Sequence, residues 1–255
     1  MTASFTTEGL QTLFLYPFKD PRWKQKLLVG SIFTFLSFIV PIIPFLFVYG
    51  YGAQIMRRII VDGEPPSLPE WEDVVSLAKT GLKVFGAVVV YLFPFFILFV
   101  LGYVAFVVPQ VALGIAEEKH RHISTGLESL LVVGMLGGFG CFGLGILGAL
   151  VVGIILPPAV AHVVATDSFL AAFKISGWWP IFRANLGGFI VSYIVLLGLS
   201  FASTFAFQIL YFTVVLCCLL PFVLSFFNTY LTLIAGVLFA QAYRGGVQNL
   251  SSPPH

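Results

Sequence analysis

Charged residues are absent from four long stretches of the chain, and these stretches dominate its pattern. No Asp, Glu, Lys or Arg occurs in residues 27–56, 84–116, 129–166 or 184–243. A helix needs roughly 20 residues to cross a bilayer core of about 30 Å, so each stretch can span once and the last can span twice. None of the stretches alternates apolar and polar positions as the strands of a membrane barrel do, so the pattern predicts helices.

The pattern therefore predicts an all-α integral membrane protein: a bundle of five to six hydrophobic helical segments, with a proline-kinked or re-entrant first segment and interfacial amphipathic helices. We expect an interfacial N-terminal segment over 1–26, a single transmembrane domain over 27–243 and a short disordered tail over 244–255. The hydrophobic segments are expected near 27–56, 84–110, 129–156, 187–212 and 221–243, and the amphipathic pieces near 7–15, 66–80 and 167–182.

The first segment is interrupted by PIIP at Pro41–Pro44, and each proline removes a backbone donor and clashes with the preceding turn. Leu27–Val40 alone would be about 21 Å long, short of a crossing, so a kinked span and a re-entrant hairpin both stay open. Five plain crossings would divide the lysines and arginines 6 to 7 between the two sides, whereas a first segment that returns to its own side divides them 11 to 2. This bias favours a pair of short re-entrant helices, with a cytoplasmic N-terminus in a multi-pass protein of the cell membrane.

Composition agrees with a membrane class. Hydrophobic residues make up 59% of the 255 residues and charged residues 9%, and the mean hydropathy is +1.02, whereas soluble domains carry about 25% charged residues. A net charge of +2 without a basic face argues against a nucleic-acid partner, so the lipid bilayer is the expected partner. Trp23, Arg57, Arg58 and Trp71 flank the apolar segments and are expected to be interfacial anchors.

Small residues recur at every fourth position of the third stretch, at Gly137, Cys141, Gly145, Ala149 and Gly153. This spacing predicts a helix face that another backbone can approach closely. The partner could be a neighbouring helix of the same chain or a second copy, in a homo-oligomer or a larger membrane complex. Loss of an oligomer on Gly145→Leu would favour the second copy.

Two places in the chain carry candidate chemistry. Glu117, Glu118, His120 and His122 lie within six residues, but their spacing matches no zinc motif, so a solvated helix end is favoured over a metal site. His162 lies in an apolar stretch with Asp167 five residues later, and such a pair could bind a ligand or serve a structural purpose near the interface. The sequence contains no G-x-S-x-G, H-E-x-x-H or Walker motif, so neither catalytic residues nor a cofactor is predicted.

The chain resembles the membrane proteins of domain-of-unknown-function family 4013. The residues that carry the likeness are Tyr16-Pro17, Trp23, Gly30, Gly50-Tyr51, Arg57 and Leu68-Pro69-Glu70-Trp71. The resemblance implies a small polytopic membrane protein of prokaryotes, and it brings no activity and no catalytic residues.

Three functions are compatible with these patterns. The one favoured by the sequence is a non-enzymatic membrane protein that acts in complex assembly, as an accessory subunit or in membrane organisation. Proline-broken apolar segments in both halves of the chain also suit a transporter or channel component for a small molecule or lipid. The third is a membrane protein that binds a cofactor or pigment. A cavity at the bilayer midplane lined by Asn or Gln would favour transport. The polar candidates within or beside the spans are Gln110, Asn185, Gln208, Asn228 and Gln241.

Overall fold

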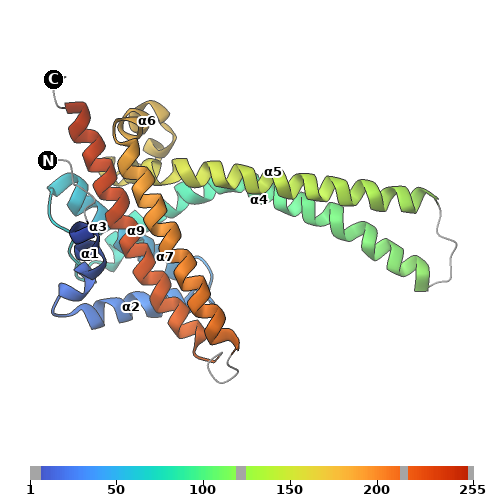
Figure 1. The fold of residues 1–255 in the computed structure, drawn as a ribbon, viewed down its shortest axis with the longest axis horizontal. Coiled ribbons are helices and arrows are strands. Elements are labelled where there is room, and N and C mark those ends of the chain that lie inside the picture. Colours follow the sequence, from blue (N-terminus) through green and yellow to red (C-terminus); the bar gives the residue numbers. More distant parts are fainter. Residues whose placement is uncertain (1–6, 119–124, 213–217, 252–255) are drawn as a thin grey trace. The chain divides into compact units, whose positions relative to one another are not determined.

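A computed structural model describes residues 7–118, 125–212 and 218–251, and every regular element in them is helical. The elements are α1 (Thr7–Leu15), η1 (Tyr16–Lys19), α2 (Trp23–Leu36), α3 (Ile43–Arg57), the π-helical turn η2 (Arg58–Asp62), α4 (Val74–Glu118), α5 (Thr125–Thr166), η3 (Phe169–Phe173), α6 (Ile175–Ala184), α7 (Leu186–Phe212) and α9 (Leu220–Ser251) (Figure 1). The prediction of an all-helical chain is confirmed for these residues.

Four of the described helices are long and apolar enough to cross a membrane, and the count of five to six hydrophobic segments stays a prediction. The candidate spans are Val74–Ile115, Ser129–Thr166, Leu186–Gln208 and Leu220–Ser251. The first apolar stretch is not among these spans, because it forms two helices, α2 and α3, of 14 and 15 residues. At 1.5 Å per residue each is about 21–23 Å long, less than the bilayer core.

The break between α2 and α3 contains a strained turn. Ile42 has φ 79° and ψ −64°, and the N–H of Ile43 donates to the carbonyl of Pro41 at 3.1 Å. These values define a γ-turn with positive φ, which a β-branched residue rarely adopts. Pro41 and Pro44 disfavour helix through this turn, so the chain changes direction here and starts α3 anew.

Two compact units make up the chain: residues 1–87 with 157–255, called unit 1, and residues 88–156, called unit 2. Unit 2 is an antiparallel hairpin of the later part of α4 and the earlier part of α5. Gly134, Gly138, Cys141, Gly145 and Gly148 face the α4 helix, and added Cβ atoms on the glycines would meet Ala105, Phe106, Phe99 or Phe95. These positions are four and three residues apart in turn, the 3.5-residue repeat of left-handed helix packing.

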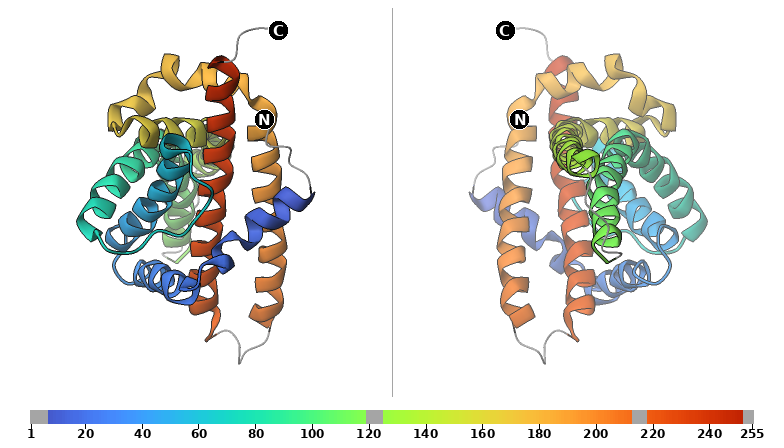
Figure 2. Two further views of the ribbon diagram at one scale, coloured as in Figure 1. Left: turned by 90° about the vertical axis from the view of Figure 1, so that its left-hand side faces the viewer. Right: turned by 90° about the vertical axis from the view of Figure 1, so that its right-hand side faces the viewer.

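Unit 1 is organised around α9, which passes through its middle beside α7 (Figure 2). Leu233, Ile234, Val237 and Leu238 of α9 are at most 1% exposed. The helix also forms hydrogen bonds with several elements: Thr229 Oγ1 with Thr34 Oγ1 at 2.8 Å, and the carbonyl of Ala242 with Asn185 Nδ2 at 2.8 Å. The helix α9 is therefore the shared packing partner of unit 1.

Several helix boundaries differ from the predicted ones. The expected disordered tail is helical as far as Ser251, because Arg244 Nη1 donates to the carbonyl of Gly63 at 3.0 Å and Asn249 Nδ2 donates to that of Ala184 at 2.9 Å. The segment expected over 129–156 continues through Pro157 and Pro158 to Thr166. Proline is tolerated inside membrane helices because neighbouring groups satisfy the freed backbone carbonyls.

The amphipathic pieces are partly as expected. The first coincides with α1, and the third contains η3 and α6, in which Trp178 is 1% exposed and Trp179 40% exposed. The piece expected over 66–80 is not a single helix, since α4 begins at Val74. Asp73 Oδ1 accepts the N–H of Ser76 at 2.9 Å and so caps the first turn of α4.

Candidate functional site: a polar pocket beside two short helices

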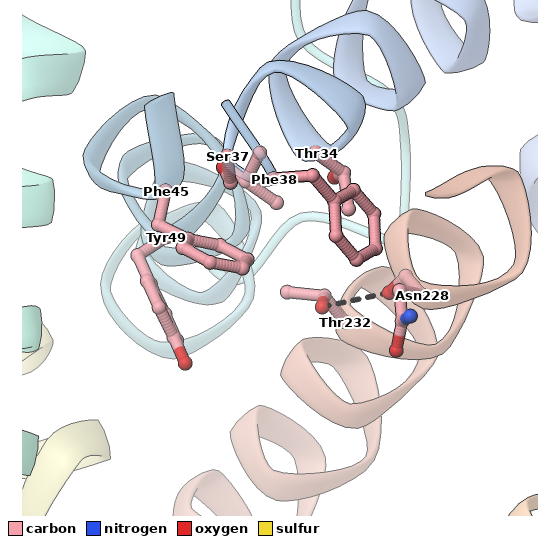
Figure 3. A pocket seen from close by; sticks show the side chains of 8 residues that line it. Thr34, Ser37, Phe38, Phe45, Tyr49, Asn228 and Thr232 are labelled. Carbon is pink, nitrogen blue, oxygen red and sulfur yellow. Dashed lines mark hydrogen bonds between the residues drawn. The ribbon is translucent and has the colours of Figure 1, made fainter. Parts of the chain in front are cut away.

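A pocket of about 360 Å³ lies in unit 1 between the adjoining ends of α2 and α3 and the N-terminal third of α9 (Figure 3). Its lining residues are Thr34, Ser37, Phe38, Phe45, Val48, Tyr49, Asn228 and Thr232. The volume is at the lower end of the range of small-molecule sites. The break at Pro41 lies between the two helix ends that line one side of the pocket.

Four hydroxyl groups line the pocket, and the three on Thr34, Ser37 and Thr232 lie within hydrogen-bond distance of a backbone carbonyl of the preceding turn. Thr34 Oγ1 donates to the carbonyl of Gly30 at 3.0 Å, Ser37 Oγ to that of Phe33 at 2.9 Å, and Thr232 Oγ1 to that of Asn228 at 2.8 Å. Bonds from Ser or Thr to the preceding turn are common in helices. The oxygens keep lone pairs that can accept further hydrogen bonds.

Asn228 supplies the pocket's amide group. Its side chain is exposed and makes no hydrogen bond to any residue in the described parts of the chain, although its backbone carbonyl accepts from Thr232. A carboxamide offers two donor hydrogens and an acceptor oxygen. The pocket can therefore both accept and donate hydrogen bonds, but it contains no charged side chain.

Towards the N-terminal end of α2, an ion cluster joins this helix to the segment Gly63–Asp73. Lys26 Nζ lies 2.6 Å from Asp20 Oδ2, 2.7 Å from Glu70 Oε1 and 2.8 Å from the carbonyl of Leu68, and Arg22 Nη2 lies 2.7 Å from Glu70. Burial raises the pKa of Asp20, but hydrogen bonds from the Lys26 ammonium and the Arg22 backbone N–H outweigh it, and the pKa falls below its usual value.

An aromatic stack lies beside the ion cluster. The ring of Trp71 lies parallel to that of Tyr51, with centroids 4.1 Å apart, and 5.5 Å from Phe33, which in turn stacks on Phe47 at 4.9 Å. The Trp71 indole N–H donates to the carbonyl of Lys26 at 3.1 Å and the Tyr51 hydroxyl to that of Pro69 at 2.7 Å. Both helices of the short pair thus hold the same segment, which follows η2.

The small residues predicted at a spacing of four do not share one environment. Cys141 and Gly145 face α4, but an added Cβ at Gly137 or Gly153 would meet no atom within 4 Å, and Ala149 is half-buried. A step of four residues advances about 40° around a helix, so the five positions wind through about 160°. The face turned to α4 follows the 3.5-residue repeat described above instead.

His162 and Asp167 have separate partners and do not form one site. His162 Nδ1 lies 2.7 Å from the hydroxyl of Tyr243, and an added Cβ at Gly177 would lie 2.6 Å from His162 Nε2, so the half-buried imidazole packs between these two residues. Asp167 Oδ1 lies 2.8 Å from Lys83 Nζ, and this hydrogen bond lowers the pKa of Asp167. Asp167 adopts φ 53° directly after α5, a conformation that Asp tolerates at helix ends.

The metal candidates Glu117, Glu118, His120 and His122 have side chains outside the described part of the chain. Within the described ranges, no group of three or more His, Cys, Asp or Glu side chains could hold a metal ion.

The predicted anchors differ in surroundings. Trp23 packs edge-on against Phe18, with centroids 4.9 Å apart, and Lys24 Nζ lies 5.8 Å from the Trp23 ring. Arg57 is exposed and reaches the carbonyl of Val164 at 3.4 Å, while Arg58 is half-exposed at the start of η2. Trp71 belongs to the aromatic stack rather than to an isolated surface position.

Most of the pocket is not predictable from the sequence. Asn228 is a predicted polar position in a span, but Thr34 and Ser37 before the PIIP break and Thr232 are not among the predicted site residues. Each of these lies within a turn or two of another small polar residue on its own helix, which is the only local signal. The convergence of α2, α3 and α9 is not visible in any one stretch of sequence.

Comparison with known proteins agrees with the resemblance found in the sequence. The family described as "Protein of unknown function (DUF4013)" matches residues 33–212, which include Gly50-Tyr51, Arg57 and Leu68–Trp71 but not Tyr16, Trp23 or Gly30. No curated protein and no solved structure matches the chain. Because the match covers well over half of the 255 residues, the chain belongs to the DUF4013 family of proteins of unknown function.

Proposed function

We propose that this chain is a non-enzymatic membrane protein that holds a small molecule or lipid within the bilayer, as a binding or transport component. The pocket between α2, α3 and α9 carries the proposal, because it combines apolar walls with a few polar groups, as small-molecule sites do. Transporters often build such sites beside interrupted helices, and α2 and α3 are the two parts of an interrupted apolar segment.

The depth of the pocket supports this function. Asn228 and Thr232 precede Arg244, the cation of α9, by 16 and 12 residues, or about 24 and 18 Å along the helix. With Arg244 at one surface of a hydrocarbon core of about 30 Å, Thr232 lies about 12 Å and Asn228 about 6 Å below the opposite surface, so both are within the core. Polar residues within the core commonly mark substrate pathways.

In the proposed topology, α2 and α3 form a re-entrant pair that enters and leaves the membrane on the side where Thr7 and Ser251 lie. Arg22 and Lys26, before and within α2, pair with Glu70, which follows α3. Lys83 pairs with Asp167, and Arg244 bonds Gly63. With four crossings by α4, α5, α7 and α9, all these groups lie on one side together with 11 of the 13 lysines and arginines. The positive-inside rule then makes this side cytoplasmic.

Cysteine labelling tests this topology. Lys19→Cys and Val75→Cys, each in a variant without the three native cysteines, are expected to react with an impermeant maleimide only in inside-out vesicles of the cell membrane. Reaction of one position from the inside and the other from the outside would contradict the re-entrant pair.

A substitution that fills the pocket tests the function. Thr232→Trp places an indole in the pocket, whereas Val223→Trp, nine residues earlier and exposed, places it about 180° around the same helix. The three proteins are isolated in native nanodiscs and analysed by mass spectrometry. We expect wild type and the Val223 variant to retain a small molecule or lipid that is absent from the Thr232 variant. The same co-purifying molecules in all three proteins would refute a ligand in this pocket.

A second candidate function, in complex assembly, is supported by the outer surface of unit 2. Gly137, Gly140 and Gly143 are exposed on α5 with no atom within 4 Å of an added Cβ. Gly145→Leu would not test oligomerisation, because Gly145 packs on Phe99 inside the hairpin. Gly140→Leu is the suitable variant: loss of an oligomer seen by native mass spectrometry would favour assembly, and an unchanged mass distribution would argue against this face.

A further inference from the structure

We infer that the pocket between α2, α3 and α9 takes an uncharged amphipathic lipid that carries a hydroxyl group at the end of an apolar chain. The inference rests on the proposed function and narrows it to one class of ligand. It follows from the hydrogen-bonding state of the lining residues, from their lack of charge and from the aromatic rings at the mouth of the pocket.

The lining hydroxyls require a ligand that donates. Ser37 and Thr232 have their protons committed to the carbonyls of Phe33 and Asn228. Thr34 Oγ1 lies 2.8 Å from Thr229 Oγ1, in a hydrogen bond that either oxygen can donate, so Ser37 and Thr232 are the available acceptors. A ligand that only accepts hydrogen bonds, such as an ester or a ketone, would leave these two oxygens unsatisfied.

Asn228 supplies the complementary donor. Its carboxamide makes no hydrogen bond within the described residues, and in Figure 3 it lies beside Thr232 on α9, across from the α2 residues. The amide N–H can donate to a ligand oxygen while Ser37 or Thr232 accepts from the same group. A hydroxyl is the simplest group that both gives one proton and accepts another.

A charged head group does not fit this position. None of the eight lining residues is ionisable near neutral pH, and Arg244 of α9 is 16 residues from Asn228, about 24 Å along the helix. An ion taken into this uncharged pocket within the core would lose hydration and gain no opposite charge. The pocket thus selects against phosphate, carboxylate and ammonium heads.

The remaining walls suit an apolar chain. Phe38 and Phe45 are 63% and 38% exposed, while Val48 is 4% exposed at the back of the pocket. In Figure 3 the rings of Phe38 and Phe45 stand on either side of the space above Thr232. A chain leaving between the two rings would enter the lipid that surrounds the exposed tip of the short helix pair, so the ligand would reach the pocket from the bilayer itself.

Photocrosslinking in nanodiscs of phosphatidylcholine tests the class. The probes are a long-chain primary alcohol with a diazirine near its hydroxyl group, and the corresponding alkyl sulfonate and alkyl trimethylammonium of equal chain length. We expect the alcohol to label residues within 34–49 or 228–232 in peptide mapping, at several times the yield of either charged probe. Asn228→Leu should lower this yield two- to tenfold, the effect of about 0.5–1.5 kcal/mol per hydrogen bond. Gln208→Leu, an exposed polar position of α7 outside the pocket, should leave it unchanged.

The outcomes separate the ligand class from the function. The inferred class is wrong if a charged probe labels the pocket as strongly as the alcohol, or if Asn228→Leu has no more effect than Gln208→Leu. In either case, a ligand that the Thr232→Trp variant loses still supports the proposed function. If no probe labels the pocket above the other lipid-facing helices and no co-purifying molecule depends on Thr232, both the class and the function are refuted.

Discussion

Lys26 is the residue whose removal tests most directly how the segment after α3 is held. Its side chain is 6% exposed, and Nζ contacts Asp20 at 2.6 Å, Glu70 at 2.7 Å and the carbonyl of Leu68 at 2.8 Å. The substitution Lys26→Met keeps the aliphatic stem and removes all three contacts. Two carboxylates then face each other without the cation between them.

The expected loss follows from the exposure of the partners. Breaking a buried ion pair by removing one member costs about 3–5 kcal/mol. Asp20 and Glu70 are 17% and 35% exposed, and Glu70 keeps Arg22 at 2.7 Å, so solvent and Arg22 compensate in part. We expect a loss of about 2–3 kcal/mol, or a fall in Tm of about 5–10 °C.

Thermal unfolding in detergent, followed by tryptophan fluorescence, measures this loss, because Trp71 bonds the backbone of Lys26 and responds to release of the segment. Lys24→Met is the matched control: Lys24 is exposed, and its only described interaction is with the ring of Trp23 at 5.8 Å, so it should change Tm by less than about 3 °C.

The pH dependence adds an independent check. The folded-state pKa of Asp20 is below its unfolded value near 3.9, so its stabilisation is present above about pH 4 and is lost as the pH falls through the lower folded pKa. The difference between wild type and Lys26→Met should therefore shrink below about pH 4. Equal Tm values for Lys26→Met and Lys24→Met at neutral pH would refute the idea that the ion cluster holds the segment.

Three further substitutions have defined outcomes. Gly81→Leu should abolish a monodisperse folded peak in size-exclusion chromatography, because a Cβ at this position would overlap the backbone carbonyl of Leu46. Gly198→Leu, with open space around the glycine, should leave the peak unchanged. Equal behaviour of the two variants would contradict the close approach of α3 and α4. Ile42→Gly should raise thermal stability by about 1 kcal/mol by relieving the positive φ, and a lower Tm would mean that the γ-turn is not strained. Asp167→Asn keeps a residue suited to φ 53° but removes the ion pair with Lys83. Because the side chain of Asp167 is 55% exposed, the substitution should lower the free energy of unfolding by only about 0.5 kcal/mol. The difference from wild type should vanish in 1 M salt, and also below about pH 4, where the lowered pKa of Asp167 no longer stabilises the folded state. A difference that persists in salt would point to packing.

Local chemistry in the sequence was sufficient where one segment determines its own structure. The helix expected over 7–15 is α1, and the prolines at 41 and 44 divide the first apolar stretch. Boundaries were less accurate where apolar context overrides a local breaker. Pro157 and Pro158 lie inside α5, because a chain in an apolar environment gains more from continuing the helix than it loses at the prolines.

Features that depend on packing between helices could not be read in advance. The glycines of α5 suggested a close approach, but which of them face α4 depends on the 3.5-residue repeat shared by two antiparallel helices. The pocket needs residues from three helices, with Thr34 and Thr232 almost 200 positions apart in the chain. A single sequence shows the polar residues but does not show that they lie close together in the fold.

The central place of α9 has a consequence for how the protein is made. Its hydrogen bonds reach Thr34 of α2, Asn185 before α7 and Gly63 after η2, all of which leave the ribosome earlier. Thr34, Asn185 and Gly63 therefore lack these partners until residues 220–251 are synthesised and inserted. During that interval other groups, such as water or lipid, must satisfy the hydrogen bonds that α9 later supplies.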